Sequence, residues 1–195
     1  LIPFGTVYAG DGHVEATARR LFEEYGFHGI KLHPFVSGEE LDDARLFPVY
    51  EAMEAGGKVL VCHPGSGPVY AKTDGASRVR AVLARFPALK VVVAHCGAVE
   101  YGDYAALADE YEGVHFDTAM NCVESHVFPN SCPGREFFER YQDRMLYGSD
   151  LPNTPYEYGA QIVSLNRLGL GAEVEAKLFG GNAARLLGLQ TNESV

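Results

Sequence analysis

Short runs of apolar, mostly β-branched residues recur along the chain and alternate with stretches whose apolar residues are spaced for a helix. Such runs are typical of strands, whereas a period of about 3.6 residues predicts an amphipathic helix. The predicted strands are residues 2–9, 29–34, 58–64, 90–96, 113–120 and 144–150. The predicted helices are residues 14–25, 48–55, 76–86, 104–111, 134–142 and 156–168. This order predicts a parallel sheet covered by helices, either a (β/α)8 barrel or an open doubly wound sheet.

A histidine ends three of the predicted strands. The stretch KVLVCHPG at 58–65 returns almost unchanged as KVVVAHCG at 90–97. His33, His63 and His95 are separated by 30 and 32 residues, which is one strand-and-helix unit each. They therefore hold equivalent positions on successive strands. Because the carboxyl ends of parallel strands meet at one mouth, where such folds place their sites, we expect the three side chains to converge there.

Strand alternation predicts which side chains face the barrel axis. The helix-facing set must be apolar, so in the strand 90–96 we assign Val92 and Ala94 to the helices and His95 to the axis. Asp150 ends the last predicted strand and is expected at the same mouth. By the same rule we expect further polar side chains to face the axis, namely those of Lys31, His33, His63, His115 and Asp117.

Imidazoles and a carboxylate around one opening suit a metal ion. Neutral histidine nitrogen and aspartate oxygen are ligands of zinc, manganese and iron. A single histidine in a strand is more often a hydrogen-bonded structural residue, and Asp117 is equally well explained as the partner of a neighbouring lysine or histidine. Several polar residues in matched positions favour a site, because strand ends do not otherwise need them.

Composition and charge exclude several classes of function. The chain has 195 residues, 47% of them hydrophobic, which is enough to bury the core of a single domain over residues 1–195. Its formal net charge is −10 and it has no basic cluster, so neither nucleic acid nor an anionic membrane is an expected partner. The longest apolar runs are only strand-length, which predicts no transmembrane segment.

The cysteines and the first residues give two further expectations. The four cysteines lack CxxC spacing and lie among apolar residues, so we expect reduced thiols in a cytoplasmic protein. The sequence opens at Leu1 inside a predicted strand, with neither a methionine nor a leader. We expect that an N-terminal part of the natural protein lies outside this sequence.

Five motifs together resemble one known superfamily. They are GIKLHP, VLVCHPG, VVVAHCG, MLYGSDLP and LFGGNAARLLGL. They resemble the amidohydrolase-related superfamily, in the branch that contains aminocarboxymuconate semialdehyde decarboxylase and related decarboxylases and hydrolases. The resemblance extends over nearly the whole chain. It implies a metal-dependent (β/α)8 barrel, of which these residues are the C-terminal three quarters, with the first two strands missing.

The resemblance also implies roles for three residues. His63 matches a metal ligand, and His95 matches the histidine that polarises the substrate or moves protons. Asp150 matches a residue that is both a metal ligand and a proton carrier. The implied cofactor is a divalent ion, zinc first, with manganese or iron as alternatives. The His-x-His pair that supplies two further ligands in the family is absent from this sequence.

Several other residues have weaker assignments. Lys31 is either carboxylated into a bridging ligand or paired with Asp117 or Asp150. His126 either lines the pocket or lies on the surface, and Asn182 is a candidate helix N-cap. Cys122 and Cys132 lie in one loop, but two cysteines without further partners rarely bind metal. By loop position alone, the candidates for holding a substrate carboxylate are Lys72, Arg78 and Arg135.

The sequence thus predicts a metal-dependent enzyme. It acts on a small carbonyl or carboxylate compound, by hydrolysis or by non-oxidative decarboxylation, and the sequence does not separate the two reactions. The expected partner is a small-molecule substrate, and a homo-oligomer is compatible with the sequence. The alternative is a non-catalytic barrel that binds a ligand or a partner with its mouth residues. A phosphodiesterase of the related TatD-like type is a poor match to the acidic composition.

Overall fold

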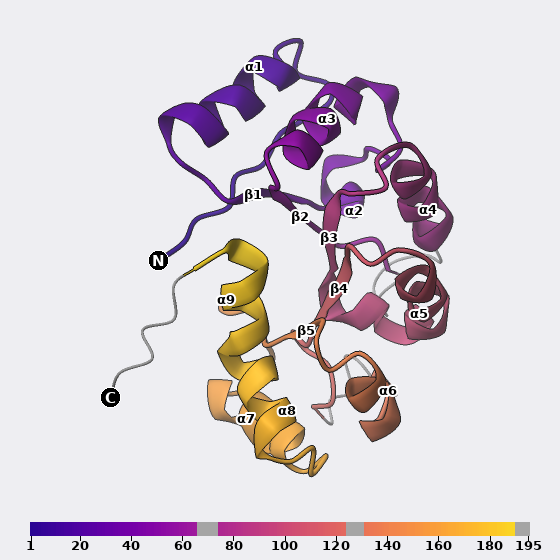
Figure 1. The fold of residues 1–195 in the computed structure, drawn as a ribbon, viewed down its shortest axis with the longest axis vertical. Coiled ribbons are helices and arrows are strands. Elements are labelled where there is room, and N and C mark those ends of the chain that lie inside the picture. Colours follow the sequence, from indigo (N-terminus) through magenta and orange to yellow (C-terminus); the bar gives the residue numbers. More distant parts are fainter. Residues whose placement is uncertain (66–73, 124–130, 190–195) are drawn as a thin grey trace.

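A parallel sheet with helices on both sides forms the body of the molecule (Figure 1). The computed structural model describes residues 1–65, 74–123 and 131–189. The sheet order is β1-β2-β3-β4-β5, so each strand lies beside the one that precedes it in the sequence. The strands are β1 (Gly29–Leu32), β2 (Val59–Cys62), β3 (Lys90–Val93), β4 (Val114–Asp117) and β5 (Met145–Leu146). Sequential parallel order with helical crossovers is the arrangement of a (β/α)8 barrel.

Most helices lie close to their predicted positions. The α-helices are α1 (Val14–Arg19), α2 (Pro34–Ser37), α3 (Phe47–Ala55), α4 (Gly75–Arg85), α5 (Tyr101–Glu110), α6 (Arg135–Arg140), α7 (Tyr158–Asn166), α8 (Ala172–Ala176) and α9 (Asn182–Leu187). Short segments of other helical types are η1 (Arg20–Glu24), η2 (Ala44–Leu46), η4 (Lys177–Gly181) and η3 (Ala94–Glu100), the last interrupted by a kink with left-handed backbone. Helices α4, α5 and α6 lie along one face of the sheet, and α9 lies along the other (Figure 1).

Two apolar clusters fill the two faces of the sheet. The larger lies between the sheet and the helices α3, α4 and α5, and it includes Val91 and Val93 of β3. The smaller lies on the opposite face, where Val92 packs in one cluster with Val59 and with Leu186 of α9. The prediction that Val92 faces the helices that connect successive strands is therefore wrong. Val91, Val92 and Val93 of β3 all accept burial on either face, so the alternation of β3 cannot be read from the sequence.

The N-terminal segment runs beside β1 but pairs with it at one position. Gly5 forms a parallel bridge with Ile30, in which the Gly5 N–H donates to Gly29 O at 3.1 Å and the Lys31 N–H donates to Gly5 O at 2.8 Å. The predicted strand over residues 2–9 is thus reduced to one bridging residue. The last predicted strand, 144–150, is shortened to Met145–Leu146.

The side chain of Asn182 connects α9 to the sheet by hydrogen bonds. The sequence had suggested that Asn182 caps a helix, but the structure shows that it does not. Its backbone is helical, and the preceding residues 177–181 already form η4. The buried Asn182 Nδ2 donates to Gln142 O and to Met145 O, both at 2.7 Å. The amide therefore satisfies two backbone carbonyls next to β5, about 40 residues earlier in the chain.

The structure pairs two of the four cysteines. Cys122 and Cys132 form a disulfide, while Cys62 and Cys96 are free and buried. The expectation of four reduced thiols is therefore wrong. Because disulfides are rare in the cytoplasm, the cysteines no longer support a cytoplasmic location. In the part of the chain that the structure describes, no helix is long and apolar enough to cross a membrane.

Replacement of Asn182 distinguishes the two explanations of its role. Asn182→Ala leaves two carbonyls without their donor, and we expect the free energy of unfolding to fall by at least about 2 kcal/mol in chemical denaturation. Asn182→Ser should lose nearly as much, because one hydroxyl cannot replace two N–H donors. A serine variant as stable as the wild type would show that helix capping, for which serine is as good as asparagine, is what Asn182 contributes.

Candidate active site at the carboxyl ends of the strands

Left-handed backbone marks the carboxyl ends of the later strands. Among the described residues, the non-glycine residues with positive φ all lie within five residues after the end of β3, β4 or β5. They are His95, Cys96, Ala98, Met120, Cys122 and Asp150. Such conformations cost about 1–3 kcal/mol each, persist only where surrounding contacts enforce them, and gather at functional sites. The observation supports the sequence prediction that the site lies at this end of the sheet.

The carboxylate of Asp117 holds the turn after β3. Its Oδ1 accepts hydrogen bonds from the backbone N–H of His95 at 2.9 Å and of Ala119 at 3.0 Å. Asp117 is thus a link between the ends of β3 and β4, and not the partner of a lysine or of a histidine ring that the sequence suggested. It fixes the residue at which β3 leaves its extended conformation, and so it fixes His95.

His95 reaches the mouth through this turn and not through strand alternation. Val91 and Val93 face the helices, so a continued strand would have directed His95 to the helices as well. Instead φ is 57° at His95, and its buried ring lies against that of His63, with the centroids 4.7 Å apart and the planes at 67°. His95 thus contacts His63, as the sequence led us to expect, but it does so because of this turn and it does not line the cavity beside His63.

The hydrogen bond of the His95 ring defines its tautomer. Nδ1 lies 2.8 Å from the backbone oxygen of Ala119. A carbonyl oxygen only accepts, so Nδ1 carries the proton and donates it. The lone pair of the neutral ring is then on Nε2. His95 is therefore oriented as metal-ligand and catalytic histidines usually are, with one nitrogen held by the protein.

His33 and His63 lie side by side at the ends of β1 and β2. Their rings are stacked, with centroids 4.2 Å apart and planes at 7°. The pKa of His63 is lowered to about 3, chiefly by burial and in addition by nearby His95, His33 and Lys31. Burial, Lys31 and His95 likewise lower the pKa of His33. Both rings are therefore neutral near pH 7, the form in which imidazole binds metal.

Asp150 and Lys31 lie at the edge of this cluster. Asp150 is exposed, and its charge raises the pKa of His33, which opposes the larger lowering by burial. Asp150 therefore lies within electrostatic range of His33, although it does not line the cavity beside His63. None of the ion pairs between described residues joins Lys31 to Asp117 or Asp150.

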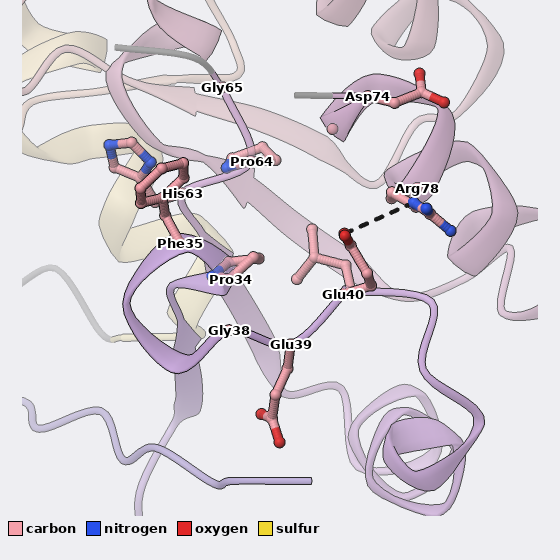
Figure 2. A pocket seen from close by; sticks show the side chains of 12 residues that line it. Pro34, Phe35, Gly38, Glu39, Glu40, His63, Pro64, Gly65, Asp74 and Arg78 are labelled. Carbon is pink, nitrogen blue, oxygen red and sulfur yellow. Dashed lines mark ion pairs between the residues drawn. The ribbon is translucent and has the colours of Figure 1, made fainter. Parts of the chain in front are cut away.

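A cavity of about 410 Å³ opens beside His63 (Figure 2). Its walls come from the segment after β1, the end of β2 and the start of α4. Arg78 contributes a guanidinium from α4, which pairs with Asp42 at 2.9 Å and with Glu40 at 3.6 Å. Further lining residues include Phe35, Leu41, Pro64 and Asp74. The volume suits a small organic molecule.

The structure places some of the other predicted residues away from the cavity. Arg135 is on α6, exposed, and paired with Glu139 at 2.7 Å. Lys72 and His126 lie outside the described residues. Of the three basic residues considered for a substrate carboxylate, Arg78 is the one that the structure places in the cavity wall.

A junction of glycines around Tyr104 joins the loops that carry His63 and His95. A Cβ on Gly97 would lie 2.0 Å from the Tyr104 ring, and one on Gly75 would lie 1.9 Å from Pro64 O. A Cβ on Gly65 would lie 2.8 Å from Gly97 O. The fully buried Tyr104 thus packs where these loops approach each other most closely. The sequence analysis missed this junction, and its one signal is the glycine that follows each histidine by two residues.

The donors at the mouth fit a divalent ion in kind. His63 offers a neutral imidazole nitrogen and Asp150 offers a carboxylate, both of which zinc, manganese and iron accept. Among residues 1–65, 74–123 and 131–189, no group of three or more His, Cys, Asp or Glu side chains is arranged to hold a metal ion. His63 and Asp150 are two donors of a suitable kind, whereas a mononuclear catalytic site usually has at least three protein ligands.

Comparison with known proteins supplies the family. The family model Amidohydro_2, described as amidohydrolase, matches residues 2–189. The chain belongs to the amidohydrolase family. Amidohydrolases of this family generally use a divalent metal ion. A curated relative from Dictyostelium discoideum, 2-amino-3-carboxymuconate-6-semialdehyde decarboxylase, is 28% identical over 214 residues, which cover 90% of this chain and 57% of the relative.

Solved structures similar to this amidohydrolase chain confirm the barrel. An uncharacterised TIM-barrel protein from Bordetella bronchiseptica superposes with a TM-score of 0.77 at 22% identity, over 95% of this chain and 66% of that one. 5-Carboxyvanillate decarboxylase from Sphingomonas paucimobilis superposes with a TM-score of 0.69 at 22% identity, over 96% and 66%. The present chain therefore spans between about half and two thirds of the length of these proteins.

The glycine junction gives a test with a matched control. Gly97→Ala combines a φ of +80° with overlap on the Tyr104 ring, and we expect the free energy of unfolding to fall by at least about 2 kcal/mol. Gly102→Ala, in α5 with nothing within 4 Å, should be neutral or gain about 0.5–1 kcal/mol. Equal effects of the two substitutions in chemical denaturation would contradict the close packing described here.

Proposed function

We propose that the protein is a metal-dependent enzyme that acts on a small carboxylate or carbonyl compound, by non-oxidative decarboxylation or by hydrolysis. The observation that carries the proposal is the contact between His63 and His95, whose ring centroids lie 4.7 Å apart at the ends of β2 and β3. His63 also lines a cavity of the right size for such a compound. The two decarboxylases to which the chain is similar support action on a small carboxylate.

His63 and Asp150 are the residues of this chain that would hold the metal, zinc first and manganese or iron as alternatives. A divalent ion bound there supplies Lewis-acid polarisation of a substrate oxygen. The His63 imidazole is suited to this role because burial keeps it neutral, so a cation does not compete with a ring proton near pH 7. Further ligands have to come from outside this pair.

His95 and Asp150 are the proposed catalytic residues. With Nδ1 donating to Ala119 O, His95 presents Nε2 to the substrate, where it stabilises a developing oxyanion when protonated and accepts a proton when neutral. Asp150 is exposed at the mouth and can exchange protons with solvent. In hydrolysis Asp150 accepts the proton of the attacking water. In decarboxylation Asp150 or His95 delivers a proton to the carbon that loses carbon dioxide.

Arg78 bears on the choice between the two reactions. A cationic side chain that holds a second substrate carboxylate would favour decarboxylation of a di-acid. Arg78 lines the cavity, but Asp42 and Glu40 already compensate its charge. The contacts therefore favour neither reaction, and the product has to decide between them.

A panel assay on full-length protein tests the proposal. The protein is purified without chelators, its metal content is measured, and carbon dioxide release and hydrolysis are followed for small aromatic and unsaturated carboxylic acids and lactones. We expect near-stoichiometric zinc, manganese or iron, and turnover of at least one compound that a chelator abolishes. Protein that holds no metal and turns over none of them would instead be the ligand-binding barrel.

The location of the protein in the cytoplasm stays a proposal. The Cys122–Cys132 disulfide opposes it. The free Cys62 and Cys96 do not separate the compartments, because burial raises the pKa of both thiols and protects them from reaction. Rapid acid denaturation of cells, followed by alkylation of the unfolded protein, decides the matter, since four alkylated cysteines indicate the cytoplasm and two indicate an oxidising compartment.

Replacing Asp150 tests the proposed proton carrier. Asp150→Asn keeps the size of the side chain but removes the base and a ligand charge, so we expect turnover to fall by at least about a hundredfold. The matched control is Asp143→Asn at the other end of β5, where an exposed carboxylate pairs with Lys177 at 3.0 Å. Near-normal turnover in the Asp150 variant would show that another residue transfers the proton.

A further inference from the structure

The His33 ring lies flat against the ring of His63. The stack has centroids 4.2 Å apart and planes at 7°. Backbone pairing brings the two residues together, because β1 and β2 run in parallel register and the His63 N–H donates to Leu32 O at 3.1 Å. The backbone of His33 is itself anchored, since its carbonyl accepts from the N–H groups of Val36 at 2.9 Å and Ser37 at 3.0 Å.

The stacked geometry excludes a shared metal ion. An imidazole binds metal through a lone pair in the plane of its ring, at about 2.0–2.1 Å for zinc. Two nearly parallel planes about 4 Å apart direct their lone pairs side by side, so these never meet at one ion. If His63 is the ligand, His33 in this arrangement is not a second one.

His33 and His95 together restrict the orientation of His63. His33 covers one face of the His63 ring, and the His95 ring meets it at 67°. A ring that contacts two neighbouring rings in this way is hindered from rotating about its χ angles, because rotation brings it against one of them. Partners that orient a ligating histidine typically contribute 10–100-fold to metal affinity.

We propose that His33 is a positioning residue that holds the imidazole plane of His63 for metal binding. The proposal rests on the function proposed above, in which His63 is a ligand. It assigns to His33 the flat surface of its ring, and not its nitrogens, as the property that matters. A phenyl ring should therefore replace it, whereas a small or non-planar side chain should not.

Cobalt(II) affinity of the full-length apoprotein tests the proposal, measured by visible absorption during titration with the metal alone. We expect His33→Ala to raise the dissociation constant at least about tenfold and His33→Phe to change it less than about threefold. His33→Leu, which keeps bulk without a flat ring, should behave like the alanine variant and replaces it if that variant unfolds. The control is His13→Ala, at an exposed histidine before α1, with wild-type affinity expected.

The outcomes separate this inference from the proposed function. Wild-type affinity in His33→Ala or His33→Leu would overturn the positioning role while leaving the metal site in place. A loss in His33→Phe as large as in His33→Ala would also overturn it, because it would make the His33 nitrogens the important atoms. If the wild type bound no cobalt, or if His63→Asn bound cobalt as tightly as the wild type, the proposed function would be overturned and the inference with it.

Discussion

The two hydrogen bonds accepted by Asp117 Oδ1 fix the ends of β3 and β4 relative to each other. Without them, nothing in the apolar run of β3 determines where the strand stops. Hydrogen bonds to a charged acceptor contribute about 1.5–3 kcal/mol each. Left-handed residues cost about 1–3 kcal/mol each, so the two bonds are comparable with the cost of the left-handed pair His95 and Cys96. The carboxylate thereby stabilises the turn that brings His95 to His63.

Close backbone contact then converts this turn into a rigid site. Glycines at 65, 75 and 97 let the loops after β2 and β3 approach each other around the buried Tyr104. The histidines at the ends of β1, β2 and β3 form a continuous row of rings as a result. Burial of the row keeps His63 neutral, because its lowered pKa lies far below neutrality. Desolvation is thus the main reason why the His63 ring is in the form that binds metal.

The sequence predicted the parts of the structure that depend on local pattern. The parallel strands and most helices were found where apolar runs and helical spacing placed them, because each element is buried by its own periodic face. The parity of β3 was wrong, since Val92 packs against Leu186, a contact nearly a hundred residues away that no local pattern encodes. The same limit explains Asp117 and Asn182, whose side chains bond to the backbone of distant segments. It also explains the disulfide between Cys122 and Cys132, which depends on where a loop returns.

The proposed function depends on a metal site at the carboxyl ends of the strands. Anomalous diffraction at the zinc edge, from crystals of full-length protein grown with zinc, tests it most directly. The account predicts an anomalous peak about 2.0–2.2 Å from a ring nitrogen of His63 and from a carboxylate oxygen of Asp150. A peak elsewhere, or none near His63, would contradict it.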